Sequence, residues 1–238
     1  MIETFTALLL AHTLADFILQ TDWMVLHKRH PRALLLHGAI VLVVAQLCTG
    51  QVAAWQLLAL TALHLLIDAT KTYASFKGLW PFLADQSAHL ATLAALALYS
   101  PDLWSTGQWS GQPWLPALMA TLAGLILTTR AGGFAIGFLM EPWSDASPKG
   151  LANGGRTIGI LERALIFLFV LVGQQAAIGF LIGAKSVLRF GSVSDDRAVS
   201  EYVIIGTLAS FGWALLTSYA TLALIQSLPL LAIMPQSP

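Results

Sequence analysis

The sequence has few charged residues and a single cysteine. Only 10% of its 238 residues are charged, and 12 basic and 12 acidic residues give a net charge of zero. The chain therefore lacks the basic excess that nucleic-acid binding requires, which excludes that class of function. The lone Cys48 excludes an intrachain disulfide. What the chain has instead is apolar: 57% of the residues are hydrophobic, and the mean hydropathy is +0.74.

Long hydrophobic runs indicate an all-α membrane protein. A soluble domain of this size has too little interior to bury so much apolar surface. Runs of about 20 apolar residues are long enough to cross about 30 Å of hydrocarbon as helices. We therefore expect a polytopic helical bundle of about seven spans, with membrane lipids around it. The expected spans are residues 2–26, 32–49, 53–75, 82–99, 116–140, 157–184 and 200–228.

The basic residues of the connectors predict an orientation in the membrane. The connectors at 27–32 and 76–81 carry lysine or arginine, whereas the turns at 49–52 and 100–115 carry neither. The positive-inside rule then places the two basic connectors in the cytoplasm and the N-terminus outside. With seven spans, however, three basic residues fall outside the cell, contrary to that rule: Lys185, Arg189 and Arg197.

One polar pattern, H-x3-D-x20-H, occurs twice within the first four expected spans. Its residues are His12, Asp16 and His37 in the first copy, and His64, Asp68 and His89 in the second, 52 residues later. An offset of two spans preserves topology, so the copies predict parallel repeats about a pseudo-twofold axis along the membrane normal. We expect a four-helix domain at 1–100, with repeats at about 1–50 and 53–100, and a three-helix C-terminal region at 116–238.

The repeated histidines and aspartates predict a buried metal site. Residues four apart share a helix face, so each copy presents a histidine and a carboxylate in one direction. A carboxylate inside the bilayer costs several kcal/mol unless it has a partner. Histidine and carboxylate together bind divalent transition metals, zinc foremost, and one His2Asp set per repeat would hold two ions. A metal-free proton relay and a structural role in pinning the helices remain alternatives.

Three further polar residues are candidates for catalytic roles. Asp85 lies four residues before His89 and is expected to act as general base or, with Gln86, to orient a histidine. Gln20 and Lys71 extend the polar stripes of spans 1 and 3 toward water, where a substrate headgroup would meet them. Snorkelling to the interface is the alternative for the lysine.

These motifs resemble an uncharacterised family of bacterial integral membrane proteins, domain of unknown function 3307. The resemblance is carried by the segments at 12–20, 64–71 and 85–89 and by His37, and in the C-terminal half by those at 158–163 and 184–190. It implies a location in the bacterial inner membrane. It implies no activity, since the family has none assigned.

The C-terminal half carries fewer polar groups. Arg130 and Glu162 are expected to pair, and Arg163 to meet lipid phosphate at the interface or merely to anchor the helix. Small residues such as Gly179 and Gly206 permit close helix packing, which is compatible with a scaffold, a substrate groove or a homo-oligomer surface.

The hypothesis that best fits these features is a membrane-embedded metal-dependent hydrolase acting on a lipid or lipid-linked substrate near the cytoplasmic leaflet. The alternatives are a transporter or channel for a divalent cation or protons, and a non-enzymatic assembly or signalling component. Ligands that gather near one face of the bilayer favour the enzyme, because transport needs a polar path from one side to the other.

Overall fold

The computed structural model describes residues 1–74, 76–147, 151, 153–190 and 197–229, with the backbone alone at 186–190. Within these ranges every regular element is helical, which confirms the all-α class. Contacts divide the chain into two compact units. Unit 1 comprises Met1–Ile126 and the chain from Ala223 onward, and unit 2 comprises Leu127–Leu222. Each unit is described by itself below.

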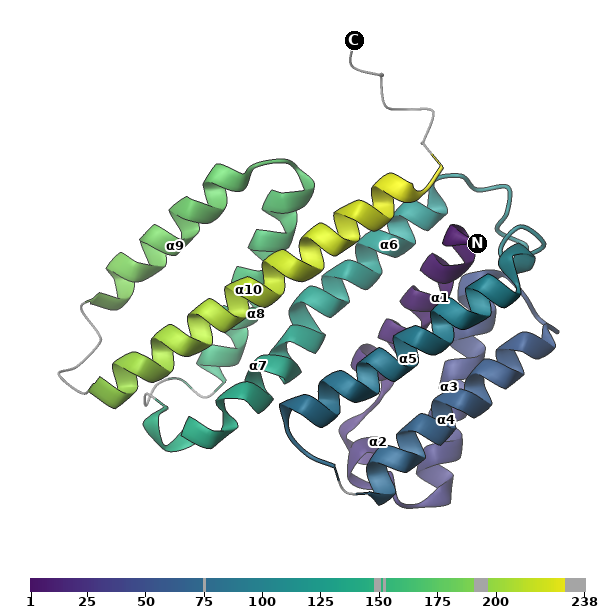
Figure 1. The fold of residues 1–238 in the computed structure, drawn as a ribbon, viewed down its shortest axis with the longest axis horizontal. Helices are drawn as coiled ribbons and strands as arrows, with labels where there is room; N and C mark the ends of the chain where they lie inside the picture. The colour runs from purple at the N-terminus through teal and green to yellow at the C-terminus, as the bar shows by residue number, and fades with distance from the viewer. Residues whose placement is uncertain (75, 148–150, 152, 191–196, 230–238) are drawn as a thin grey trace, which may run out of the picture. The chain divides into compact units, whose positions relative to one another are not determined.

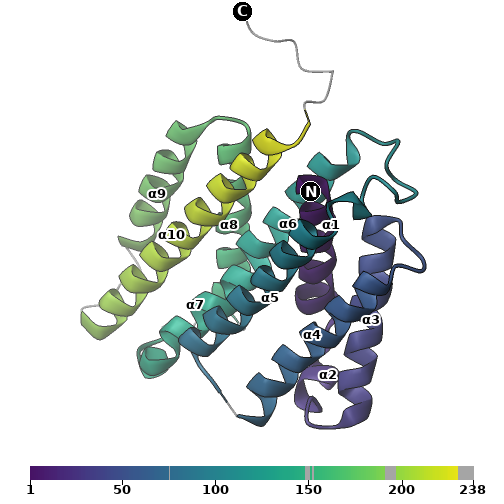
Figure 2. The same cartoon turned by 45° about the vertical axis from the view of Figure 1, so that its right-hand side comes forward.

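Unit 1 is a bundle in which the N-terminal helix occupies the centre (Figures 1 and 2). Helix α1 contacts α3, α5 and α6, while α3 packs on α4 and α4 on α5. A helix that is apolar on all sides suits a central position, and nearly every α1 side chain from Thr4 to Thr13 is buried. The helices are α1 (Ile2–Leu14), α2 (Asp22–Leu26), α3 (Pro31–Thr49), α4 (Trp55–Tyr73), α5 (Leu79–Tyr99) and α6 (Leu115–Ile126).

The first expected span, 2–26, is not one helix. After α1 the chain widens into a π-helical segment, Ala15–Leu19, and then leaves the helix at Gln20, whose ψ of 104° is extended. Thr21 caps the short helix α2, because its side chain accepts a hydrogen bond from the Met24 amide. The expectation of an unbroken helix to residue 26 was therefore wrong, and the break lies beside the candidate site.

Unit 2 contains α7 (Gly132–Met140), α8 (Gly154–Leu171), α9 (Gln175–Phe190) and most of α10 (Arg197–Ser227). A π-helical segment, Leu127–Ala131, precedes α7. Two side chains satisfy carbonyls of this segment: Trp213 Nε1 donates to Leu127 O at 3.0 Å, and Arg163 Nη2 donates to Thr129 O at 2.9 Å. The distortion is thus compensated by neighbouring helices.

The expectation of a single helix at 157–184 was also wrong, because α8 and α9 form a helical hairpin in this region (Figure 1). Gly173 has φ +71°, a left-handed conformation that ends α8 and reverses the chain. Apolar residues then pack together inside unit 2, including Ile166, Val170 and Phe211.

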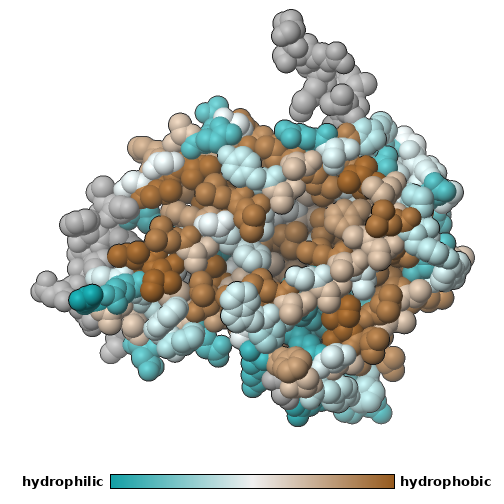
Figure 3. Space-filling model, viewed as in Figure 1, coloured by the Kyte–Doolittle hydropathy of each residue, from teal (hydrophilic) through white to brown (hydrophobic). Residues whose placement is uncertain are grey.

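Four helices are long and apolar enough to cross a membrane, among the residues that the structure describes. They are Ile2–Leu19, Pro31–Thr49, Leu115–Ala146 and Arg197–Ser227. Much of the face seen in Figure 3 is hydrophobic, as membrane association requires. The count of seven stays a prediction. Helix α4 has the length of a span, and its mean hydropathy is lowered by polar residues such as His64 and Asp68 that point inward.

The boundary between the units differs from the expected domain boundary. The sequence placed residues 116–140 with the C-terminal region, whereas the structure groups α6 with unit 1, where it packs against α1. The hydropathy of that helix gave no indication of its packing partner. The internal repeat stays a prediction, and its two copies differ locally, because α1 ends in a π-helix whereas α4 continues as an α-helix to Tyr73.

Candidate metal centre

Unit 1 brings the four histidines and three aspartates singled out in the sequence into one buried cluster, here called the His/Asp cluster. His12 comes from α1, Asp16 from the π-helical segment, His37 from α3, His64 and Asp68 from α4, and Asp85 and His89 from α5. The histidines are at most 3% exposed, and Asp68 and Asp85 are 2% and 7% exposed. Burial to this degree demands that each group have a partner.

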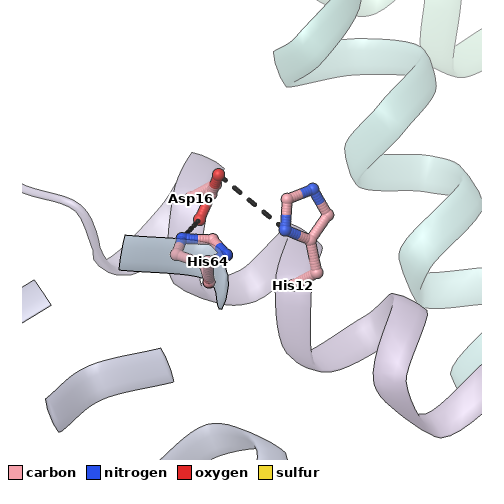
Figure 4. A group of neighbouring side chains, drawn as sticks. All are labelled: His12, Asp16 and His64. Carbon is pink, nitrogen blue, oxygen red and sulfur yellow. Dashed lines mark ion pairs between the residues drawn. The ribbon is translucent and has the colours of Figure 1, made fainter. Parts of the chain in front are cut away.

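Asp16 lies among three imidazoles. Its Oδ1 is 3.3 Å from His64 Nε2 and 3.5 Å from His37 Nε2, and its Oδ2 is 3.8 Å from His12 Nδ1. Figure 4 shows His12 and His64 approaching this carboxylate from two different helices. The π-helical segment carries Asp16, and such segments often re-aim side chains at functional sites.

His37 and His64 meet at the middle of the cluster. Their Nε2 atoms are 3.0 Å apart, and His37 Nε2 is also 3.4 Å from Asp68 Oδ2. Tetrahedral ligands about 2.0–2.1 Å from a zinc ion lie about 3.3 Å from one another. Asp16 Oδ1, His37 Nε2 and His64 Nε2 are therefore spaced like three ligands that share one ion, and Asp68 Oδ2 lies at a similar distance from His37 Nε2.

The remaining two histidines lie against this group. The His12 ring stacks on His89 with centroids 5.1 Å apart, and the His89 ring lies 4.2 Å from that of His64. His89 Nδ1 donates to Asp85 O at 2.9 Å, which fixes the tautomer and leaves its buried Nε2 without a hydrogen bond. This is the arrangement in which histidine presents a lone pair to a metal.

Lysines neutralise two of the three carboxylates. Lys28 Nζ bonds both oxygens of Asp68, at 3.0 and 3.1 Å, and Lys71 Nζ bonds Asp85 Oδ2 at 2.7 Å. Among the described residues, Asp16 has no lysine or arginine partner, although its side chain is only 9% exposed. With neutral histidines the cluster therefore carries one uncompensated negative charge, and that charge belongs to Asp16.

The expected catalytic residues occupy the edge of the cluster. Lys71 was expected to face water, and its side chain is 30% exposed, but its ammonium group turns inward to Asp85. Asp85 is held by this lysine and by Gln86 Nε2 at 3.2 Å, and Gln86 Oε1 in turn lies 3.2 Å from His12 Nε2. Gln20 is partly buried, and its Nε2 has no hydrogen-bond partner.

Sequence reasoning missed one functional candidate, Lys28. Its charge served only to assign the topology of the connector between α2 and α3, yet the side chain reaches back to a carboxylate 40 positions away. No local spacing predicts such a contact, because the fold of the connector creates it.

Contacts in the cluster run both within and between the two repeats. Three groups have ligand atoms close enough to hold an ion: His12, Asp16 and His64; His37, His64 and Asp68; and Asp68, Asp85 and His89. The first two groups mix residues of both repeats, whereas the third lies within the second repeat. Asp16 also contacts both histidines of its own repeat, His12 and His37. One ligand set per repeat stays a prediction.

The N-terminal half can now be compared with known proteins. Residues 4–111 match the model of the family described as Protein of unknown function (DUF3307). The match confirms the resemblance inferred from the motifs, and all residues of the His/Asp cluster lie within the DUF3307 segment. The C-terminal motifs at 158–163 and 184–190 lie outside it. No curated protein and no solved structure shows significant similarity to the chain.

Proposed function

We propose that the His/Asp cluster binds a divalent transition metal, zinc in first place, and that the protein is a membrane-embedded metal-dependent hydrolase. The observation that carries the proposal is the position of Asp16, whose side chain is only 9% exposed, lies among imidazoles and has no lysine or arginine partner among the described residues. A divalent ion compensates this charge and uses the neutral histidine lone pairs at the same time.

Asp16, His37 and His64 are the ligands that the spacing favours for the first ion. Their three mutual distances are 3.0, 3.3 and 3.5 Å, close to the edges of a zinc coordination tetrahedron. Asp68, whose Oδ2 is 3.4 Å from His37 Nε2, would be a further ligand. Because Lys28 already holds Asp68, the carboxylate is suited either to close the coordination shell or to accept a proton from water in that position.

A second ion fits the group formed by Asp68, Asp85 and His89. Asp68 belongs to this group and to the group with His37 and His64, so it would bridge two ions. Paired ions joined by a carboxylate suit hydrolysis, because one can hold the attacking water and the other the leaving oxygen. In this arrangement His12 and Gln86 support the ligands from outside.

An anionic lipid or lipid-linked compound is the proposed substrate class. Lys28 and Lys71 lie at the edge of the cluster with side chains 20% and 30% exposed, and their ammonium groups, which bond Asp68 and Asp85, are within reach of an anionic headgroup. Gln20 adds an unpaired amide donor. On α2, Trp23 and Leu26 are 51% and 81% exposed, a pattern typical of a segment lying in the lipid headgroup region.

The proposed orientation keeps the N-terminus outside and the lysine-bearing connectors of unit 1 in the cytoplasm. The α8–α9 hairpin removes the mismatch of the seven-span scheme, because a hairpin returns the chain to the side from which it left. With both hairpin helices counted as spans, the positive-inside rule is met by Lys185 and Arg197. Exposed leucines on α4, among them Leu58 and Leu66, support its assignment as a further span.

A proton or cation pathway is the alternative, and the contacts among the four imidazoles favour it. The chain of rings ends at His12, however. Toward the N-terminus, α1 continues with the buried apolar residues Leu8, Leu9 and Leu10. A polar route across the bundle would need further groups there, so the geometry supports the enzyme better.

Metal analysis tests the binding step. Wild-type protein should purify with stoichiometric metal, the Asp16→Asn/Asp68→Asn double variant should lose it, and Asp102→Asn, at an exposed position, should keep it. A wild-type protein that binds no divalent ion would refute the proposal.

Turnover in vesicles tests the catalytic step. Protein reconstituted into vesicles that contain phosphatidic acid should release inorganic phosphate in a metal-dependent manner, and Asp85→Asn should reduce the rate. Metal-dependent ion flux without turnover of that lipid or other anionic lipids would instead establish transport.

A further inference from the structure

Unit 2 contains a cavity of about 520 Å³ that has no part in the His/Asp cluster. Its wall combines charged and hydroxyl side chains with apolar ones. The residues that matter here are Glu162, Arg163, Lys185, Tyr202, Gly206 and Ser210. A volume of this size accommodates a ligand of several hundred daltons, such as a lipid headgroup with its glycerol.

Arg163 is the buried cation of this cavity. It is 3% exposed, and its Nη1 donates to Ser210 Oγ at 3.1 Å while its Nη2 donates to Thr129 O at 2.9 Å. Both acceptors are neutral, and Nε has no hydrogen-bond partner. A guanidinium group has five N–H donors, so these two bonds hold it in place without satisfying it.

The carboxylate next to Arg163 in the sequence is committed elsewhere. Glu162 Oε2 accepts a hydrogen bond from Lys185 Nζ at 2.6 Å, which replaces the pair with Arg130 that the sequence suggested. Arg130 is exposed instead. Among the described residues of the cavity wall, the three charged side chains therefore sum to one positive charge, and Arg163 carries it.

Glycines shape the space around the guanidinium group. A Cβ atom would lie 3.1 Å from Arg163 Nε at Gly132, 3.4 Å from Nη2 at Gly133, and 3.0 Å from Nη1 at Gly159. Side chains at these positions would crowd the arginine. Two backbone segments without side chains, on α7 and α8, thus leave room for a large planar cation deep in a membrane protein, where such a group is costly without an anion.

We propose that this cavity binds the phosphate group of an anionic phospholipid and that Arg163 recognises it. Arginine pairs with phosphate through parallel N–H donors, and the ligand charge would balance the cavity. Tyr202 and Ser210 offer hydroxyls to the headgroup. The outer faces of α8 and α10 expose Leu161 and Leu208, at 58% and 66%, along which acyl chains can lie. This site is independent of the proposed metal centre.

Lipid titration of the purified full chain in detergent tests the proposal. Native mass spectrometry should show phosphatidylglycerol binding about tenfold to a hundredfold more tightly than phosphatidylcholine, the range given by one to two charge-assisted hydrogen bonds. Arg163→Gln should abolish the difference. Arg156→Gln, which removes an exposed arginine near the start of the same helix, should preserve it.

A second variant covers the case in which Arg163→Gln fails to fold. Gly206→Leu leaves the arginine in place and fills the cavity, since a Cβ there meets only the flexible Met140 side chain at 3.6 Å or more. It should also abolish the preference. Equal binding of the two lipids, an unchanged preference in Gly206→Leu, or competition by inorganic phosphate at the same concentration as the lipid would overturn the assignment to a phospholipid.

Discussion

Replacing Asp16 with asparagine should affect the metal-free and the metal-loaded protein in opposite directions. Without metal, the Asp16 carboxylate is buried among histidines and lacks a cation. Asparagine has nearly the same shape but no charge, so we expect the metal-free variant to be more stable than wild type by about 1–3 kcal/mol.

The metal-loaded protein should respond in the other direction. At a free zinc concentration of 100 times the wild-type Kd, binding adds about 2.7 kcal/mol to stability. Loss of one ligand should weaken affinity at least about 100-fold, since changes at supporting residues alone reach that size. The same zinc concentration would then add only about 0.4 kcal/mol to the variant. For a chain of this size the two increments correspond to roughly 5–11 °C and about 1 °C in Tm.

Thermal unfolding of the purified protein in detergent provides the assay, first with a chelator and then over a zinc titration. Asp102→Asn is the matched control, because it makes the same chemical change at an exposed position. A full zinc-dependent rise in Tm for Asp16→Asn would remove this residue from the ligand set. A variant less stable than wild type in chelator would show that the charge is compensated by protonated histidine instead.

Three further substitutions test the packing described above. Lys28→Met should destabilise the metal-free protein by about 3 kcal/mol, because it leaves the buried Asp68 carboxylate without its lysine. Added zinc should restore part of this stability. Chemical denaturation with and without zinc measures the loss and the recovery. Gly173→Ala should cost about 1 kcal/mol through its φ of +71° alone, since no atom lies within 4 Å of the new Cβ; a cost near zero in thermal unfolding would contradict the left-handed turn. Gly132→Ala should cost about 1–3 kcal/mol, because its Cβ would lie 2.6 Å from the Trp213 ring, whereas Gly137→Ala on the same helix should be neutral or stabilising in the same assay.

Helix class and most helix positions could be predicted from local information. Hydropathy placed α3, α4, α5 and α10 within a few residues of their observed bounds. The predictions failed where the backbone departs from a regular helix inside an apolar run, at Gln20 and at Gly173. Hydropathy averages over such runs and cannot distinguish one long helix from two shorter ones, so only conformational detail locates the turn.

The candidate site was predicted in composition but not in arrangement. Spacing on individual helices identified all four histidines and the three aspartates. The grouping into ligand sets depended on which helix faces meet, and the packing adds contacts between the repeats, such as His64 with Asp16 and His37 with Asp68. Lys28 is the clearest omission, since its contact with Asp68 joins a connector to a helix 40 residues away.

The sequence by itself determined that this is a helical, membrane-type chain with a buried concentration of histidine and aspartate, because composition and the 3.6-residue period act within single helices. The tertiary structure decided that Asp68 and Asp85 pair with lysines, whereas Asp16 pairs only with histidines among the described residues. It also decided that Arg163 donates to two neutral groups and to no carboxylate in the part of the chain that the structure describes. These outcomes depend on distances between helices, and those distances are set by side-chain packing across the whole bundle and not by any local pattern.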